Sequence, residues 1–356
     1  MADPEGLRGL KVMVAADFFQ EWRGSAWTEG LRQLGVETAE YNWSVDHSEG
    51  TAGYLERRVL LGPGIGRINR RIMECVAEEA PNVLLIYAGR LIWPETIKAL
   101  SKLCVVAGYD NDDPFGRWGL QPYFRHYRGG LGNYSCHHVF RELNVAEYQR
   151  AGCARVKLLR SFYLPWIHKP IPPSEDDRRN TPYEVVFVGN GQPGSRVEHV
   201  TALARAGVRV QIRGEPRYWH RYLPKDVIRR LPPIRPARGA DYARIIAKAP
   251  VSLAFFSDGN RDQYTVRAFE IPACGGFMLA QRTPVMQWLF EEGQEAEYFS
   301  TSSELIAKIR HYLVNDDARR KVASAGRRRC VADGHDVVNR MRQWLADLRG
   351  WGLLPS

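Results

Sequence analysis

The sequence lacks any long hydrophobic run, and its longest apolar stretch extends only over residues 83–88. A helix that crosses a bilayer needs about 20 apolar residues, so we expect no transmembrane helix. The first residues are acidic, whereas a secretory signal has a basic start and an apolar core. We therefore expect a cytoplasmic protein, either free or peripheral at the inner face of the membrane.

Cysteine and lysine are also scarce. The six cysteines are dispersed and form no C-x-x-C pair, so we interpret them as reduced structural thiols instead of a disulfide framework. Only nine of the 50 basic residues are lysine, and the arginines are spread along a chain of net charge +10. Nucleic-acid binding would require a localised basic stripe with aromatic platforms, so we expect no nucleic-acid partner.

Alternating strand and helix patterns fill most of the 356 residues. In the first half, buried-strand runs at residues 10–16, 82–88 and 103–108 alternate with helical spacing at 26–34, 68–79 and 94–101. The same rhythm resumes after residue 183. We predict an α/β protein with two Rossmann-like domains, each a parallel sheet covered by helices, facing a central cleft. The glycines at 62–66 follow no clear strand, and we predict a loop there.

A glycine-rich turn stands where the second half begins. Residues 189–194 read GNGQPG and fit G-x-G-x-x-G, between a predicted strand and a predicted helix. Such a turn brings backbone N–H groups and a helix N-terminus close to phosphate. Glu215 follows at the spacing of the ribose-binding carboxylate in nicotinamide-binding proteins, so an NAD(P)-dependent oxidoreductase is one interpretation. A turn that needs glycine only for its backbone angles is the other.

A carboxylate among apolar residues marks the next motif. Glu270 lies between Phe269 and Ile271 in a short predicted helix that ends at Gly275-Gly276. A buried charge needs a partner. Arg267, three residues earlier, is one candidate, and the vicinal hydroxyls of a bound ribose are the other.

These residues carry a family resemblance. The segment R-x-F-E-I-P-A-C-G-G-F, with Asp262 seven residues before Glu270, and the downstream F-E-E-G-Q-E-A-E-Y-F and S-S-E-L resemble GT-B glycosyltransferases. The most similar group is that of the spore protein CgeB, classed with the group 1 glycosyltransferases. By this resemblance Glu270 holds the donor ribose, and Asp262 replaces the Glu that lies near the sugar. The implied donor-binding residues are Gly189, Asn190, Gly191, Arg196, Tyr264, Arg267, Glu270 and Gly275.

The resemblance also implies a domain layout. We expect an N-terminal Rossmann-like acceptor domain at 1–165, a linker at 166–182, a nucleotide-sugar donor domain at 183–335, and a helix at 336–356 that crosses back to the first domain. The expected function is transfer of a sugar from a nucleotide-diphosphate sugar to an acceptor hydroxyl, in bacterial cell-surface glycan or protein glycosylation. A nucleotide-sugar epimerase of related fold is an alternative beside the oxidoreductase.

Candidate catalytic groups in the first half are aspartates at the carboxyl ends of predicted strands. We take Asp17, Asp112 and Asp113, together with Asp262 of the second half, as candidates for the catalytic carboxylates. Asp110 and Asp112 also spell D-x-D, a metal-binding pattern in another glycosyltransferase fold. Because arginine and a helix terminus can balance the donor phosphates, we expect neither a metal nor a cofactor. His137 and His138 are adjacent on a strand and point to opposite faces, which argues against a shared metal site.

The acceptor is expected to be a glycan, a lipid-linked sugar or a protein. Arg67, Arg70 and Arg71 on a predicted helix suggest contact with an anionic membrane that would bring a lipid-linked acceptor within reach. A solvated face and a soluble acceptor are the alternative.

Overall fold

The computed structural model describes residues 7–18, 23–117, 121–172 and 182–354. The chain divides into two compact units, one from Met1–Ser161 and Val337–Ser356 and the other from Phe162–Asp336. The predicted linker at 166–182 falls within the second unit, and its residues 173–181 lie outside the described residues. No helix in the described part of the chain is long and apolar enough to cross a membrane.

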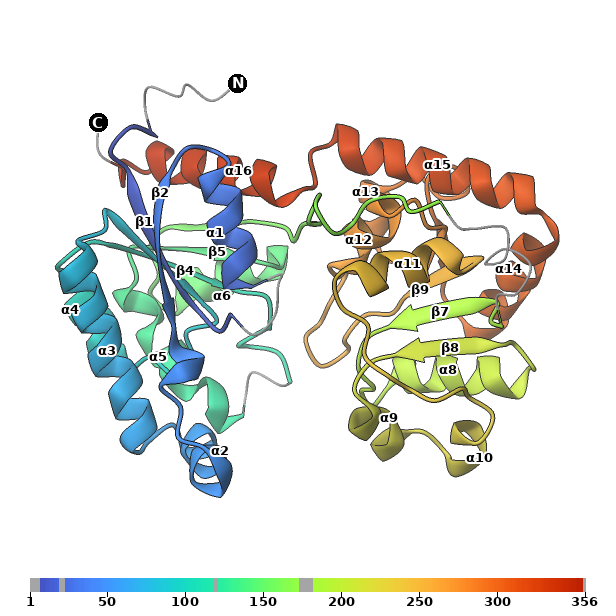
Figure 1. Ribbon diagram of the computed structural model, residues 1–356, viewed down its shortest axis with the longest axis horizontal. Coiled ribbons are helices and arrows are strands. Elements are labelled where there is room, and N and C mark those ends of the chain that lie inside the picture. The colour runs from blue at the N-terminus through green and yellow to red at the C-terminus, as the bar shows by residue number, and fades with distance from the viewer. Residues whose placement is uncertain (1–6, 19–22, 118–120, 173–181, 355–356) are drawn as a thin grey trace. The chain divides into compact units, whose positions relative to one another are not determined.

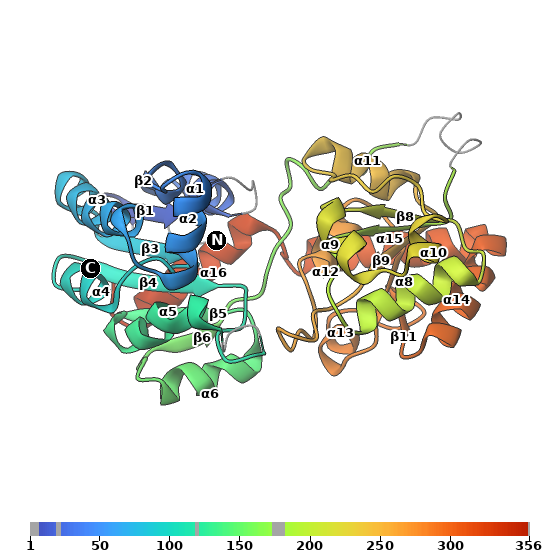
Figure 2. The ribbon, with the colours of Figure 1, turned by 90° about the horizontal axis from the view of Figure 1, so that it is seen from below.

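The first unit is built on a six-stranded parallel sheet of order β2-β1-β3-β4-β5-β6. Its strands are β1 (Lys11–Ala16), β2 (Glu37–Asn42), β3 (Val83–Tyr87), β4 (Val105–Asp110), β5 (Cys136–Val139) and β6 (Val156–Leu158). Its α-helices are α1 (Gly24–Arg32), α2 (Gly50–Val59), α3 (Pro63–Glu79), α4 (Pro94–Leu100), α5 (Arg125–Gly130), α6 (Glu142–Arg150) and α16 (Val337–Gly350). Helices cover both faces of this sheet (Figures 1 and 2).

Burial on both faces explains the composition of the central strands. Every residue of β3, VLLIY, is buried, as expected for a strand between two helical layers. Leu84 and Ile86 on one face belong to a core cluster with Ile65, Ile68 and Ile72 of α3. The spacing of these isoleucines places them on a single helix face, so α3 is held by an apolar stripe.

The prediction of a loop at residues 62–66 is wrong, because α3 begins at Pro63. Proline is favoured in the first turn of a helix, where its missing N–H would have no partner. Gly64 is required by close packing, since a Cβ there would lie 2.5 Å from Glu56 Oε2 and 2.7 Å from the backbone N of Ser48. The glycines therefore serve a tight helix start.

Helix α16 completes the first unit although 175 residues of the second unit precede it, from Phe162 to Asp336. It packs on α1, where a Cβ at Gly30 would lie 2.9 Å from Met341 Cγ. Asp347 of α16 also contacts His138 of β5 at 3.1 Å and Lys157 of β6 at 2.7 Å. Helix α16 is therefore an integral layer of the first unit.

The second unit contains a five-stranded parallel sheet of order β11-β10-β9-β7-β8. Its strands are β7 (Val185–Val188), β8 (Val210–Arg213), β9 (Val251–Ala254), β10 (Met278–Gln281) and β11 (Glu297–Phe299). Its helices are α8 (Ser195–Arg205), α9 (Pro216–Tyr222), α10 (Lys225–Ile228), α11 (Ala240–Lys248), α12 (Arg267–Ala273), α13 (Pro284–Leu289), α14 (Ser302–Val314) and α15 (Asp316–Ala332).

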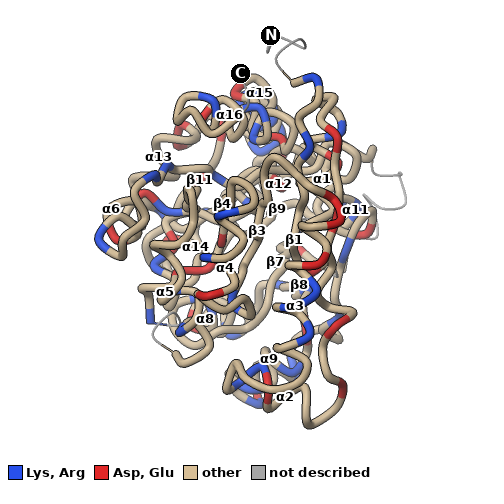
Figure 3. Tube along the Cα trace, turned by 90° about the vertical axis from the view of Figure 1, so that its left-hand side faces the viewer, with Lys and Arg blue, Asp and Glu red and all other residues tan. Residues whose placement is uncertain are grey.

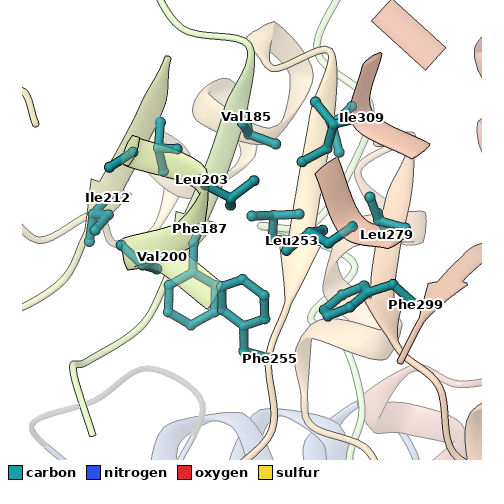
Figure 4. Packing of buried hydrophobic residues seen from close by; sticks show 14 of the residues in the cluster. Val185, Phe187, Val200, Leu203, Ile212, Leu253, Phe255, Leu279, Phe299 and Ile309 are labelled. Carbon is teal, nitrogen blue, oxygen red and sulfur yellow. The ribbon is translucent and has the colours of Figure 1, made fainter. Parts of the chain in front are cut away.

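One hydrophobic cluster joins this sheet to α8 and α14. Figure 4 shows its centre, where Val200 and Leu203 of α8 face Val185, Phe187 and neighbouring strand residues. The rings of Phe187 and Phe255 lie 4.8 Å apart in this layer. Phe187 and Phe255 flank the carboxyl ends of β7 and β9, so the core anchors the loops that follow these two strands. The predicted fold class, two parallel α/β sheets covered by helices, is confirmed.

Candidate functional site

The order of the strands in the second unit has a switch point between β7 and β9. Strands β7 and β9 are neighbours, while the chain leaves β7 toward β8 on one side and β9 toward β10 on the other. In open parallel sheets, ligands bind at such a switch point, beyond the carboxyl ends of the strands. The loops that start there are residues 189–194 after β7 and residues 255–266 after β9.

The glycine turn after β7 is packed against its own protein. The indole Nε1 of Trp219 donates to the carbonyl oxygen of Gly189 over 2.9 Å, and Asn190 Oδ1 accepts from the backbone N of Glu215, also at 2.9 Å. A Cβ on Gly191 would lie 2.8 Å from the carbonyl oxygen of Tyr218. Glycine is therefore needed here for close packing with the segment after β8, independently of any ligand.

An internal carboxylate occupies the start of α8. Asp258, in the loop after β9, accepts from the backbone N of Ser195 through Oδ2 and from its hydroxyl through Oδ1, both at 3.0 Å. A Cβ on Gly194 would lie 2.3 Å from Asp258 Oδ2, which explains the glycine at that position. The helix N-terminus that the sequence offers to phosphate thus carries an Asp cap from another loop.

Arg196 lies in the first turn of α8 and is buried. Its guanidinium donates to the carbonyl oxygens of Asn190 at 2.6 Å and Phe255 at 3.4 Å, and it lies over the ring of Phe187. Burial, reinforced by the positive charge of Arg267, lowers the pKa of Arg196 to about 10. Within the described residues Arg196 forms no ion pair, so its charge is balanced only at a distance.

Arg267 begins α12 and points back to the glycine turn. Its Nε donates to the carbonyl oxygen of Val188, and its Nη2 would lie 3.5 Å from a Cβ on Gly189. Thr265 orients it, accepting from the backbone N of Arg267 at 3.1 Å. Arg267 also forms no ion pair with any described residue. Two positively charged side chains, Arg196 and Arg267, therefore converge on the turn after β7.

Glu270 is buried one helical turn after Arg267, but Arg267 is not its partner. The basic side chain that lies beside it is His168, whose Nε2 is 3.8 Å from Glu270 Oε1. Because His168 Nδ1 accepts from the backbone N of Leu164 at 2.9 Å, the neutral imidazole carries its proton on Nε2, facing the carboxylate. Tyr242 is the third member, and burial together with the negative charge of Glu270 raises its pKa.

The remaining predicted site residues of the second unit lie around these groups. Asp262 Oδ2 accepts from the backbone N of Ser257 at 3.3 Å, and its charge acts on Arg196. Tyr264 is buried against Phe269. Gly275 has φ +77°, the left-handed geometry that ends α12 and suits glycine. The structure thus brings the turn after β7, Arg196, Asp262 and Arg267 to one edge of the second sheet.

The predicted catalytic aspartates of the first unit all form ion pairs or accept hydrogen bonds. Asp17, directly after β1, pairs with Arg23 at 3.0 Å. Asp110 and Asp112 both accept from Arg90, at 2.7 and 2.6 Å. Asp113 is fully buried and accepts from Asn144 Nδ2 and from a backbone N–H, both at 3.0 Å. The D-x-D carboxylates are therefore held by a guanidinium.

Nowhere in the described ranges do three His, Cys, Asp or Glu side chains gather in a way that could hold a metal ion. His137 packs among Tyr127, Tyr134 and Tyr148, whereas the ring of His138 meets Trp351 and Asp347. The two histidines lie on opposite faces of β5, as predicted.

Sequence comparison finds a family match that covers most of the second unit and the first part of α16. Residues 196–346 match the family model described as glycosyl transferase-like. This region is a glycosyl transferase-like domain. The match confirms the resemblance and the enzyme class, glycosyltransferase. No curated protein matches the chain at a significant level.

Solved structures agree on the GT-B fold. Sucrose-phosphate synthase from Thermosynechococcus elongatus is similar with a TM-score of 0.69 at 12% identity, covering 96% of this chain and 99% of that one. HepE from Anabaena, solved with UDP and glucose, gives 0.62 at 13% identity over 96% and 100% of the two chains. A protein from Listeria monocytogenes described as a UDP-N-acetylglucosamine 2-epimerase gives 0.56 at 12% identity over 96% of each chain.

Three groups at this edge of the second sheet are not identified by the sequence. Asp258 follows strand β9, so the rule that ligand groups lie at carboxyl ends of strands offered a signal for it. His168 stands in a proline-rich segment that reads as a linker, and Tyr242 lies on a different helix from Glu270. Nothing local in the sequence connects His168 or Tyr242 with the carboxylate that they contact.

Proposed function

We propose that the glycosyl transferase-like unit binds a nucleotide-diphosphate sugar and that the protein transfers the sugar to an acceptor hydroxyl. The observation that carries this proposal is the pair of arginines at the switch point. Arg196 and Arg267 converge on the turn after β7, and neither forms an ion pair within the described residues. A diphosphate between them would supply the missing negative charge through charge-assisted hydrogen bonds.

The proposed nucleoside contact is Glu270. A buried carboxylate accepts the two vicinal hydroxyls of a ribose well, since each hydroxyl can donate one hydrogen bond. His168 Nε2 lies 3.8 Å from Glu270 Oε1, which is longer than a hydrogen bond. Glu270 and Arg267 lie on one short helix, so α12 would set the spacing between ribose and diphosphate.

The chemistry that follows is substitution at the anomeric carbon. The acceptor oxygen forms a bond to that carbon, the bond to the diphosphate oxygen breaks, and the nucleoside diphosphate leaves with the electron pair. Arg196 and Arg267 stabilise the charge that develops on the leaving group. Asp17, Asp112 and Asp262 remain the proposed catalytic carboxylates, one of which would receive the acceptor proton. Full burial and two hydrogen bonds make Asp113 the weakest candidate.

Uridine diphosphate is the first donor nucleotide to test, because HepE was solved with UDP and with UDP-glucose. For the acceptor, we propose a cell-surface glycan, a lipid-linked sugar or a protein. The likeness to the epimerase fold makes product analysis essential, since an epimerase would release an isomerised nucleotide sugar without any acceptor.

The test is calorimetric titration with UDP and uridine on the wild type, Glu270→Gln and a matched Glu304→Gln variant. Glu304 lies on α14 and is held by Arg282, away from the turn after β7. We expect Glu270→Gln to weaken both ligands about tenfold, since a hydrogen bond to a charged group contributes roughly 1.5–3 kcal/mol. Unchanged affinity in a folded Glu270→Gln variant would remove Glu270 from the ribose site.

A further inference from the structure

Helix α2 presents an apolar face to solvent. Among its residues only Gly53 is buried. Tyr54, Leu55 and Val59 are each 54% exposed, and Leu55 and Val59, four residues apart, share a helix face. The backbone explains this one-sided burial, because a Cβ on Gly53 would lie 1.6 Å from the carbonyl oxygen of Ser48. The helix therefore docks through its glycine and turns its large side chains outward.

Two further apolar residues, close to α2 in the sequence, are also exposed. Val45, in the segment before α2, is 76% exposed, and Leu61, just after it, is 53% exposed. We call Val45, Tyr54, Leu55, Val59 and Leu61 the α2 surface. Single exposed apolar side chains are normal on proteins, but five along one short stretch indicate an interaction site.

Arginines border the α2 surface. Arg57 and Arg58 belong to α2, and Arg125 donates to the carbonyl oxygen of Val59 at 3.4 Å. Arg67 donates to the carbonyl oxygen of Asp46, next to Val45, at 3.1 Å. Among the described residues none of these four arginines forms an ion pair. The bordering charge is therefore available to an external anion.

The arginines that the sequence suggested for this role behave differently. Arg71 pairs with Glu74 at 3.1 Å and with Glu78 at 3.5 Å, and Arg70 reaches Glu74 at 3.9 Å. Arg70 and Arg71 are thus partly neutralised by their own helix. Of the predicted set, only Arg67 belongs to the border of the α2 surface.

Helix α2 lies at the carboxyl edge of the first sheet. It follows β2 through a single 3-10 turn, Trp43–Val45, and so lies beyond the carboxyl end of that strand. Figure 1 shows α2 projecting from the first unit. Carboxyl ends of parallel strands carry the ligand sites of such folds, so a surface bound at α2 would lie near groups such as Asp17.

We propose that the α2 surface docks the protein on an anionic phospholipid bilayer. Tyr54, Leu55 and Val59 enter the boundary between headgroups and acyl chains, and the four arginines contact the lipid phosphates. An apolar helix face with basic residues beside it is the pattern of interfacial helices. This inference concerns the first unit alone and does not depend on the donor site proposed above.

The test is co-sedimentation with vesicles of phosphatidylcholine containing 30% phosphatidylglycerol, against vesicles of pure phosphatidylcholine, at about 50 mM and 500 mM salt. The wild type should sediment with the anionic vesicles at low salt only. Arg57→Glu with Arg58→Glu should weaken binding at least about 25-fold, since each basic residue near the surface contributes about fivefold. Leu55→Asp with Val59→Asp should also abolish sedimentation.

Matched controls separate the α2 surface from general charge and hydrophobicity. Arg229→Glu with Arg230→Glu changes an exposed adjacent pair in the second unit, and Val314→Asp changes a valine that is 81% exposed on α14. Both variants should sediment like the wild type. Circular dichroism and thermal melting on every variant confirm that both units are folded.

Three results would overturn the proposal. The wild type could stay in the supernatant with anionic vesicles at low salt. The α2 variants could sediment as well as the controls, or Arg70→Glu with Arg71→Glu could abolish binding that the α2 variants retain. A concentration-dependent dimer that dissociates in Leu55→Asp with Val59→Asp, without vesicle binding, would assign the surface to a second copy of the chain instead.

Discussion

A buried arginine lies at the carboxyl edge of each sheet, and the two arginines differ in their hydrogen-bond partners. In the first unit Arg90 is buried, bonds both oxygens of Asp110, and reaches Asp112 and Tyr123 as well. In the second unit Arg196 is buried and, among the described residues, donates only to carbonyl oxygens. The same side chain on the same kind of sheet is neutralised in one place and uncompensated in the other.

This difference indicates which edge is prepared for an anion. A buried ion pair with complete hydrogen bonding costs little further free energy to maintain, whereas a buried cation without a partner carries a desolvation penalty. Binding a phosphate at Arg196 would relieve that penalty, while binding one at Arg90 would have to displace two carboxylates. Elsewhere the charges are mixed, and Figure 3 shows Lys and Arg interspersed with Asp and Glu along the trace.

The largest effect is expected from removing the neutralised arginine. Arg90→Met should lower the free energy of unfolding of the first unit by about 3–5 kcal/mol, because Asp110 is left buried without its cation. Urea denaturation followed by circular dichroism measures the loss. The double variant Arg90→Met with Asp110→Asn should recover most of it. Equal stabilities for wild type and Arg90→Met would show that Asp110 does not depend on Arg90.

Removal of the uncompensated arginine should instead act on binding. Arg196→Ala is expected to weaken UDP about 10- to 100-fold, since charge-assisted hydrogen bonds contribute roughly 1.5–3 kcal/mol, and to leave uridine unchanged. Calorimetry on both ligands measures the difference. Arg205→Ala, at the exposed end of the same helix, is the matched control and should bind like the wild type. Equal losses for UDP and uridine would contradict a phosphate role.

Buried or paired titratable groups make the stability of each unit depend on pH. Burial lowers the pKa of His137 in the first unit to about 3, far below its ordinary 6.5. The unfolded chain therefore takes up a proton that the folded unit refuses, and stability falls by up to about 1.4 kcal/mol per pH unit below pH 6.5. In the second unit the hydrogen bond from Arg282 lowers the pKa of Glu304 to about 2, so its contribution persists down to about pH 4.5 and is lost below it.

Thermal melts between pH 7 and 5 should consequently show the first unit losing stability as the pH falls. Burial also lowers the pKa of His199 in the second unit, so the stability of that unit should fall in the same direction. His137→Gln should flatten the slope of the first transition in this range. An identical slope in wild type and variant would mean that His137 is not the group responsible.

The smallest effect is expected from chelation. Because Arg90 holds Asp110 and Asp112, and arginines stand at the second edge, sugar transfer should be unchanged by EDTA. Turnover assayed with UDP-glucose before and after chelation measures this. Activity that disappears and returns with magnesium or manganese would mean that the two aspartates leave Arg90 to bind a metal.

The periodicity of apolar residues predicted the helices that bury an apolar stripe. It did not predict helices that bury little apolar surface. The predicted helix at 94–101 agrees with α4 to within one residue, because apolar residues recur there at helical spacing after a proline. Helix α2 was missed, since a helix that buries only one glycine shows no buried stripe. Helix α9 was missed as well, because Pro216–Tyr222 is short and mostly polar or aromatic.

The candidate site was predictable where a motif is continuous and not where contacts are distant. Glu270 stood out because a carboxylate among apolar residues needs a partner. The nearby Arg267 was considered for that role, and the structure gives it to His168, far away in the sequence. The glycine turn was correctly placed between strand and helix, but its tight packing against Trp219 depends on a tertiary contact that no local pattern contains.

The return of the chain to the first unit has a consequence for synthesis. While the ribosome produces residues up to Asp336, the strands and α1 of the first unit are already made, but α16 is not. Gly30 on α1 and His138 on β5 then lack the layer that covers them. The second unit is contiguous and can fold as it emerges, so the unit translated first is completed last. Chaperone demand should therefore fall on the first unit, in the interval before α16 emerges.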